Sequence, residues 1–134
     1  MISVQTQTPI KYKDLDLNFN IHPVKKDVNK HIDNMAVIHS VKNLLLTNHY
    51  EKLFHPEIGS NVRKLLFDNL DSITAIALRR EIEQTLSNFE PRINVQNLEL
   101  RPDYDNNAYG VTLTFSVLDK STPITVEFSL SRVR

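Results

Sequence analysis

Three runs in which apolar and polar residues alternate occupy the C-terminal part of the sequence, and they constrain the fold more than any other feature. The runs cover residues 93–100, 111–117 and 124–130. Alternation with a period of two is typical of strands with one buried face, and the short polar connections favour an antiparallel three-strand meander. The alternation changes phase within the first run, which predicts a β-bulge near Gln96 and Asn97. Turns are expected at residues 105–107 and 119–123.

Three segments before these runs carry helical signals: residues 33–47, a short stretch after Gly59 and Ser60, and residues 71–89. In the last segment apolar residues recur every three or four positions, which is the period of an amphipathic helix. Asp71 is suited to cap its start, and Pro91 ends it because the residue before a proline avoids helical angles. Helices followed by a meander predict an α+β domain, with two or three helices packed on a small, mainly antiparallel sheet.

The N-terminal part carries fewer signals. Residues 1–14 are polar and predict an arm that precedes a single domain over residues 15–134. Residues 15–21 alternate and predict a further strand, whereas residues 24–30 predict a loop. Two expectations concern single apolar residues. Met35 is placed on the inward face of the first helix, and Leu53 and Phe54 in a short extended piece.

Composition excludes several classes of function. The chain has 134 residues, a net charge of zero, no cysteine and only two glycines. Zero net charge argues against a nucleic-acid partner, because phosphate binding needs a surplus of Lys and Arg. The lack of cysteine removes disulfides, thiolate metal sites and thiol nucleophiles, and two glycines cannot form a glycine-rich phosphate loop. No apolar run reaches the roughly 20 residues of a membrane helix, so we expect no membrane partner.

Residues suited to catalysis or metal binding are present but form no recognised pattern. The five histidines lack a metal-binding motif, although His49 and His55 flank a loop that also holds Glu51 and Glu57. Nothing in the sequence pairs two carboxylates in the way that a glycosidase requires. We therefore expect no catalytic residue, no metal site and no cofactor.

Glu90, Pro91 and Arg92 form a candidate partner-docking motif at the end of the long helix. The proline fixes the backbone where helix becomes strand, so the directions of the two charged side chains are partly preset. The planar guanidinium suits a carboxylate or the backbone carbonyls of a partner. The alternative is an ordinary helix exit, with a Glu–Arg contact inside the chain or with solvated charges.

The last strand is a second candidate surface. If it lies at the edge of the sheet, its backbone groups can pair with a strand from another chain, while alternate side chains give specificity. Alternatively, Arg132, Arg134 and Pro123 protect the edge, or the strand over residues 15–21 covers it. The apolar positions of this strand are Ile124, Val126, Phe128 and Leu130.

Four short segments occur in a specific order and spacing: SVKNL at 40–44, FHPEIGS at 54–60, LLF at 65–67 and NFEPRI at 88–93. Together they resemble the baseplate wedge, or sheath-initiator, protein family of contractile-tailed phages, in which a Glu-Pro-Arg tripeptide after a long helix is a signature. The resemblance covers residues 15–134. The chain departs from the family at residues 47–52, which read TNHYEK where Thr-Arg-x-Gly-Glu-Arg is commoner.

The resemblance implies a structural protein of the virion tail baseplate, assembled in the host cytoplasm and present in six copies per baseplate. Its implied partners are other baseplate wedge proteins and the tail sheath protein. Glu90 and Arg92 inherit the expectation of docking on the core helical bundle of the wedge. The sheet inherits the expectation of receiving extended arms from the first sheath ring, which templates sheath polymerisation.

Two other functions remain open at this point. One is a peptidoglycan hydrolase of the tail, with Glu57 or Glu90 as the general acid, which needs a raised pKa and a nearby partner group. The other is an adaptor in a contractile injection machine that is not a phage, since the related protein of type VI secretion baseplates does similar work.

Overall fold

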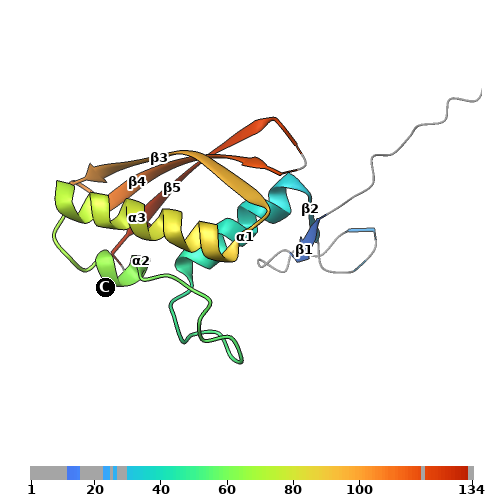
Figure 1. Ribbon diagram of the computed structural model, residues 1–134, viewed down its shortest axis with the longest axis horizontal. Helices are drawn as coiled ribbons and strands as arrows, with labels where there is room; N and C mark the ends of the chain where they lie inside the picture. The colour runs from blue at the N-terminus through green and yellow to red at the C-terminus, as the bar shows by residue number, and fades with distance from the viewer. Residues whose placement is uncertain (1–11, 16–22, 25, 27–29, 119, 133–134) are drawn as a thin grey trace, which may run out of the picture. The chain divides into compact units, whose positions relative to one another are not determined.

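The computed structural model describes residues 12–15, 23, 24, 26, 30–118 and 120–132. The chain forms two compact units, Met1–Ser40 and Val41–Arg134. In chain order the elements are β1 Lys13–Leu15, β2 Lys30–Ile32, α1 Asn34–Leu46, α2 Val62–Leu65, α3 Ser72–Phe89, β3 Ile93–Asp103, β4 Ala108–Val117 and β5 Pro123–Ser131 (Figure 1). Helices that precede a C-terminal antiparallel sheet confirm the expected α+β class.

The first unit contains a short two-stranded sheet, in which β1 and β2 pair antiparallel. Asp33 extends this pairing beyond the ladder. Its amide donates to the carbonyl oxygen of Tyr12 at 2.8 Å, and its carboxylate accepts a hydrogen bond from the Tyr12 amide at 3.2 Å. The Asp33 carboxylate thus holds the chain before β1 against the start of α1.

One part of the N-terminal expectation was wrong, because Lys30 lies in a strand and not in a loop. Lys13 and Asp14, at the end of the expected arm, lie in strand β1. Pairing between these two short segments satisfies their backbone groups, and three-residue strands are too short for alternation to reveal them. The strand expected over residues 15–21 lies outside the described residues, except for its first residue, which ends β1.

The three C-terminal strands form the predicted antiparallel meander in the order β3-β4-β5. The register of β4 with β5 places Val111 opposite Phe128 and Leu113 opposite Val126. The register of β3 with β4 shifts between Val95 and Asn97, which confirms the bulge that the change of phase predicts. The bulge puts Leu98 on the buried face, where it is fully buried.

Helix α3 packs against β3 and lies along one face of the three-stranded sheet (Figure 1). Asp71 caps it as expected, since its Oδ1 accepts a hydrogen bond from the Thr74 amide at 2.7 Å. The buried residues of α3 face the buried side of β4, and both follow the predicted periods. The apolar residues of this core are Leu78, Ile82 and Leu86 of α3 and Val111, Leu113, Phe115 and Val117 of β4.

Tyr109 links the sheet to the start of α3. Its side chain is 2% exposed, and its hydroxyl donates to the carbonyl oxygens of Asp71 at 3.3 Å and Asn69 at 3.5 Å. Burial raises the pKa of the Tyr109 hydroxyl, which keeps the group protonated as a donor. The same residue therefore fills the core and fixes the chain just before the helix.

Two single-residue expectations were wrong. Met35 is 49% exposed, whereas the buried residues of α1 are Ala36, Val37, Val41, Leu44 and Leu45. Phe54 is 94% exposed and lies in a turn with φ of +67°, so residues 53 and 54 form no extended piece. The turn is closed by a hydrogen bond from the Tyr50 amide to the Pro56 carbonyl. The apolar side chains of Leu53 and Phe54 give no sign of this bond between residues on either side of them.

Candidate docking surface

Glu90 and Arg92 form a two-pronged ion pair at the junction of α3 and β3. Arg92 Nε donates to Glu90 Oε1 at 2.5 Å, and Nη2 donates to Oε2 at 2.7 Å. The Glu90 side chain is 3% exposed and that of Arg92 is 31% exposed. A buried carboxylate is tolerated only with a partner and hydrogen bonds, and the guanidinium supplies both.

Backbone hydrogen bonds hold this junction on both sides. The Glu90 amide donates to the Leu86 carbonyl at 3.0 Å, which closes the last turn of α3. The Arg92 carbonyl accepts from the Leu118 amide at 2.9 Å, which ties the start of β3 to the end of β4. The contact between Glu90 and Arg92 inside the chain, one of the two expected alternatives, is therefore present, and it leaves the partly exposed guanidinium at a fixed place. Docking of a partner on this motif stays a prediction.

Strand β5 is an edge strand of the three-stranded sheet in the part of the chain that the structure describes. It pairs with β4 alone, from Pro123 to Ser131. Its apolar positions face the core side and are half-buried or buried: Ile124, Val126, Phe128 and Leu130. Whether residues 16–21 cover this edge lies outside the described residues. The geometry is that of a strand which can receive another strand on its unpaired side.

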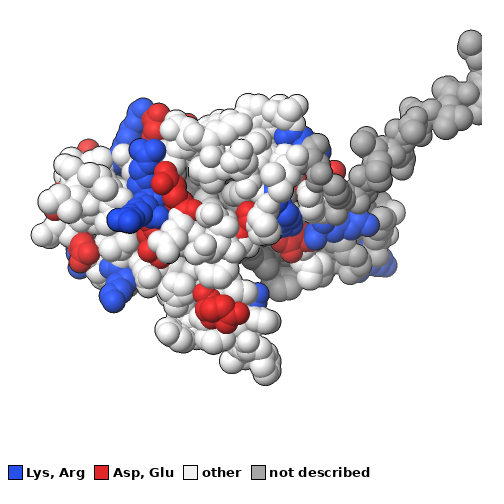
Figure 2. Space-filling model, in the orientation of Figure 1, with Lys and Arg blue, Asp and Glu red and all other residues white. Residues whose placement is uncertain are grey.

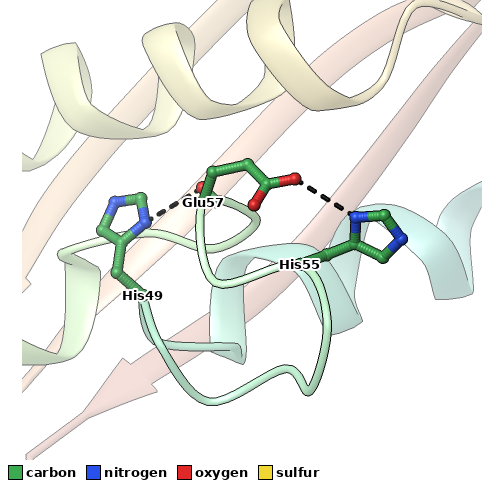
Figure 3. Close-up of polar contacts among 3 residues, drawn as sticks. All are labelled: His49, His55 and Glu57. Atoms are coloured by element: carbon green, nitrogen blue, oxygen red, sulfur yellow. Dashed lines mark hydrogen bonds and ion pairs between the residues drawn. The ribbon is translucent and has the colours of Figure 1, made fainter.

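The loop between α1 and α2 brings His49, His55 and Glu57 together. His49 Nδ1 lies 3.2 Å from the Glu57 carbonyl oxygen, and His55 Nδ1 lies 3.2 Å from Glu57 Oε1. Figure 3 shows Glu57 between the two imidazoles, with its carboxylate turned toward His55. Among the described residues no group of three or more His, Cys, Asp or Glu side chains is arranged to hold a metal ion.

This loop is fixed by a close backbone approach at Gly59. Gly59 has φ of +148°, and a Cβ at this position would lie 2.7 Å from the carbonyl carbon and oxygen of Asn48. The next residue, Ser60, is buried, and its hydroxyl donates to the Leu45 carbonyl at 2.8 Å. The N-cap position of α2 is Asn61, whose side chain makes no capping hydrogen bond.

Charges of both signs lie close together on the face shown in Figure 2, over the α3 and β3 part of the second unit. Two of the exposed ion pairs there join Arg79 to Glu83 and Arg101 to Glu99, at 3.0 and 3.2 Å. Among the described residues no helix is long and apolar enough to cross a membrane.

Sequence reasoning missed a cavity beside the end of β5. The cavity lies between α2 and the strand and includes Arg63, Lys64 and Phe67. The sequence held a signal for it, because the cations Arg63 and Lys64 are followed within one helical turn by the aromatic residue Phe67, which is exposed. The sequence did not show that β5 ends against that helix.

Solved structures define the class of fold. A chain of the anti-feeding prophage baseplate has a TM-score of 0.63 at 15% identity, covering 92% of this chain and 87% of that one. A chain of the post-contracted pyocin R2 baseplate has a TM-score of 0.57 at 18% identity, covering 73% and 96%. A protein of Geobacter sulfurreducens that bears the provisional name tail lysozyme has a TM-score of 0.66 at 17% identity, covering 73% and 89%. At these identities the likeness shows the fold alone.

The sequence defines the family. Residues 33–120 match the model of the baseplate wedge protein gp25 family. The baseplate wedge protein gp25 of Enterobacteria phage T4 is 33% identical over 117 residues, which are 84% of this chain and 85% of that protein. The chain therefore belongs to the baseplate wedge protein gp25 family, whose role is structural, and the resemblance seen in the sequence is confirmed.

Proposed function

We propose that this protein is a structural component of a contractile tail baseplate, located in the virion tail, and that it supplies the β5 edge as a template for the first sheath ring. The observation that carries the proposal is the unpaired side of β5 in a chain of this family. Main-chain pairing gives affinity to an added strand, and the alternate apolar positions of β5 give it a fixed register.

The Glu90–Arg92 pair supports docking on the core of the baseplate wedge. Because both carboxylate oxygens hold the guanidinium, Arg92 presents its exposed part in one orientation without ordering a flexible side chain on binding. The other proposed features follow from the family. They are six copies per baseplate and assembly in the host cytoplasm. The polar composition of residues 1–14 supports, in addition, an arm before one domain over residues 15–134.

We propose further that the protein is not an enzyme. The pKa of Glu57 is lowered, chiefly by a backbone hydrogen bond and then by His55, whereas a general acid needs a raised pKa. Both oxygens of Glu90 are engaged by Arg92. The name of the Geobacter protein belongs to that protein, and 17% identity carries its fold alone to this chain.

Affinity capture from a lysate in which the whole tail assembles tests the docking proposal. Tagged Glu90→Leu/Arg92→Leu removes both charges together and so leaves no buried carboxylate unpaired. Arg79→Leu/Glu83→Leu, which removes an exposed pair on α3, is the matched control. We expect the first variant to lose wedge proteins and the control to keep them. Equal capture by both variants, with matched thermal melts, would place wedge docking elsewhere.

Proline substitution tests the sheath proposal. Neighbouring amides of a strand point to opposite sides, so one of Thr125→Pro and Val126→Pro removes an amide on the unpaired side and leaves the β4 ladder intact. The variant that keeps the wild-type melting temperature is the informative one. We expect it to lose the sheath protein while it still captures the wedge. Normal sheath capture by that variant would contradict templating on β5. If the captured proteins come from an injection machine that is not a phage, the protein is an adaptor of that machine.

A further inference from the structure

A cavity of about 580 Å³ opens where β5 ends against α2. Its apolar lining includes Leu46 of α1, Leu66 directly after α2 and Leu130 of β5. Figure 1 shows α2 beside the C-terminal end of the sheet. A volume in this range holds a large side chain with room to spare. Because Ser129, Leu130 and Ser131 line it, the cavity continues the edge of β5 and does not form a separate site.

The charged residues of the cavity carry one sign. Arg63 and Lys64 line it, and no Asp or Glu does. Within the described residues neither cation forms an ion pair, whereas Arg79 of α3 and Arg101 of β3 each pair with a glutamate. A third cation lies close by, since the Arg132 guanidinium is 5.3 Å from the centre of the Phe67 ring. The cavity thus has an apolar floor, an aromatic wall that is 54% exposed and a rim of unpaired cations.

We propose that this cavity takes an apolar side chain with a neighbouring carboxylate, both carried by the extended partner segment that pairs with β5. The inference rests on the proposed strand addition and names the chemistry of the segment. A strand added along residues 124–131 reaches the cavity at its end, where the alternate side chains of that strand face the floor. The residue two positions further along points to the same side of that strand and lies at the rim, where a carboxylate meets Arg63 and Lys64. Burial of the apolar side chain beside this pair strengthens the attraction, because water is excluded.

The test uses the full-length chain and the purified, monomeric sheath subunit of the same tail as the probe. Arg63→Glu/Lys64→Glu reverses the rim, and Phe67→Ala removes the wall without touching the buried core. Lys42→Glu/Arg80→Glu, at exposed positions outside the cavity, is the control with the same change of net charge. Dissociation constants are measured at low and high salt, with thermal melts of every variant.

We expect the rim reversal to weaken binding about tenfold or more at low salt, and the control to change it about twofold or less. Wild-type affinity should fall as salt rises, whereas that of the rim variant should not. Phe67→Ala should weaken binding about threefold at both salt concentrations. Unchanged or tighter binding by the rim reversal, with binding abolished by the folded proline variant, would overturn the acidic segment and leave strand addition intact. No binding by the wild type would overturn both.

Discussion

Arg92 holds both carboxylate oxygens of Glu90, a residue whose side chain is 3% exposed. We expect Arg92→Ala to lower the free energy of unfolding by about 3 kcal/mol, because it removes the guanidinium that holds both oxygens of a buried carboxylate. Glu90→Leu/Arg92→Leu should recover most of this loss, since no charge then remains in the core. Urea denaturation of the two variants measures both values. Equal stability of Arg92→Ala and wild type would show that solvent already screens the pair.

The cap of α3 predicts a pH dependence. The pKa of Asp71 in the folded chain is lowered from 3.8, chiefly by the hydrogen bond from the Thr74 amide. As the pH falls, the Asp71 carboxylate therefore binds a proton in the unfolded chain before it does so in the folded chain. The stability that the charged carboxylate contributes above its ordinary pKa is lost as the pH falls through the lower pKa of the folded chain. Asp71→Asn, which keeps a capping oxygen, should show a smaller loss between about pH 5 and pH 2.

Melting temperatures across this range compare the two proteins. Asp103 is a necessary control, because hydrogen bonds from Asn106 lower its pKa as well and its contribution is lost in the same direction. Parallel curves for wild type and Asp71→Asn, offset by a constant amount, would assign the acid sensitivity to Asp103 and other carboxylates.

Gly59 is the position in the loop between α1 and α2 where we expect a substitution to cost the most stability. We expect Gly59→Ala to destabilise the chain by about 2 to 4 kcal/mol, because φ of +148° is strained for alanine and the added Cβ meets the Asn48 backbone. Gly110→Ala is the control, since the nearest atom to its Cβ lies at 3.7 Å. Chemical denaturation should give a much lower free energy of unfolding for Gly59→Ala than for Gly110→Ala. Similar values would mean that the loop shifts to accommodate the Cβ at little cost in free energy.

The tip of the same loop predicts the opposite behaviour. Leu53 is 82% exposed and Phe54 is 94% exposed, so neither contributes to the core. Replacing both with serine should change the free energy of unfolding by less than about 0.5 kcal/mol. A larger loss of free energy of unfolding in the monomeric chain would show that Leu53 and Phe54 pack against other residues in solution.

Sequence reasoning succeeded where a local rule decides the structure. Asp71 and Pro91 mark the ends of α3 because capping and proline geometry act within a few residues. The change of phase after Val95 locates the bulge, because every second residue of a regular strand lies on the same face and an extra residue shifts this pattern to the other face. The alternation in β4 and β5 likewise gives the buried face of the sheet.

It failed where distant groups decide. The turn at Tyr50 and Phe54 is set by a hydrogen bond to Pro56 and by positive φ at both residues, and apolar side chains give no sign of either. The Glu90–Arg92 geometry was one of two alternatives that the residues alone leave open. The cavity beside β5 needed the packing of α2 on the end of a strand that lies some sixty residues later in the chain.

The bulge between Val95 and Asn97 makes the two edges of the three-stranded sheet different. Strand β3 forms the side opposite β5, and an edge strand that bends at a bulge makes a poor template for a flat neighbour. Two copies that met through β5 would leave only bulged edges outward, so this sheet has no route to an endless ribbon. If β5 accepts a strand as proposed, the sheet gains one strand at that edge and offers only the bulged β3 edge to a second, so we expect one strand donor for each acceptor.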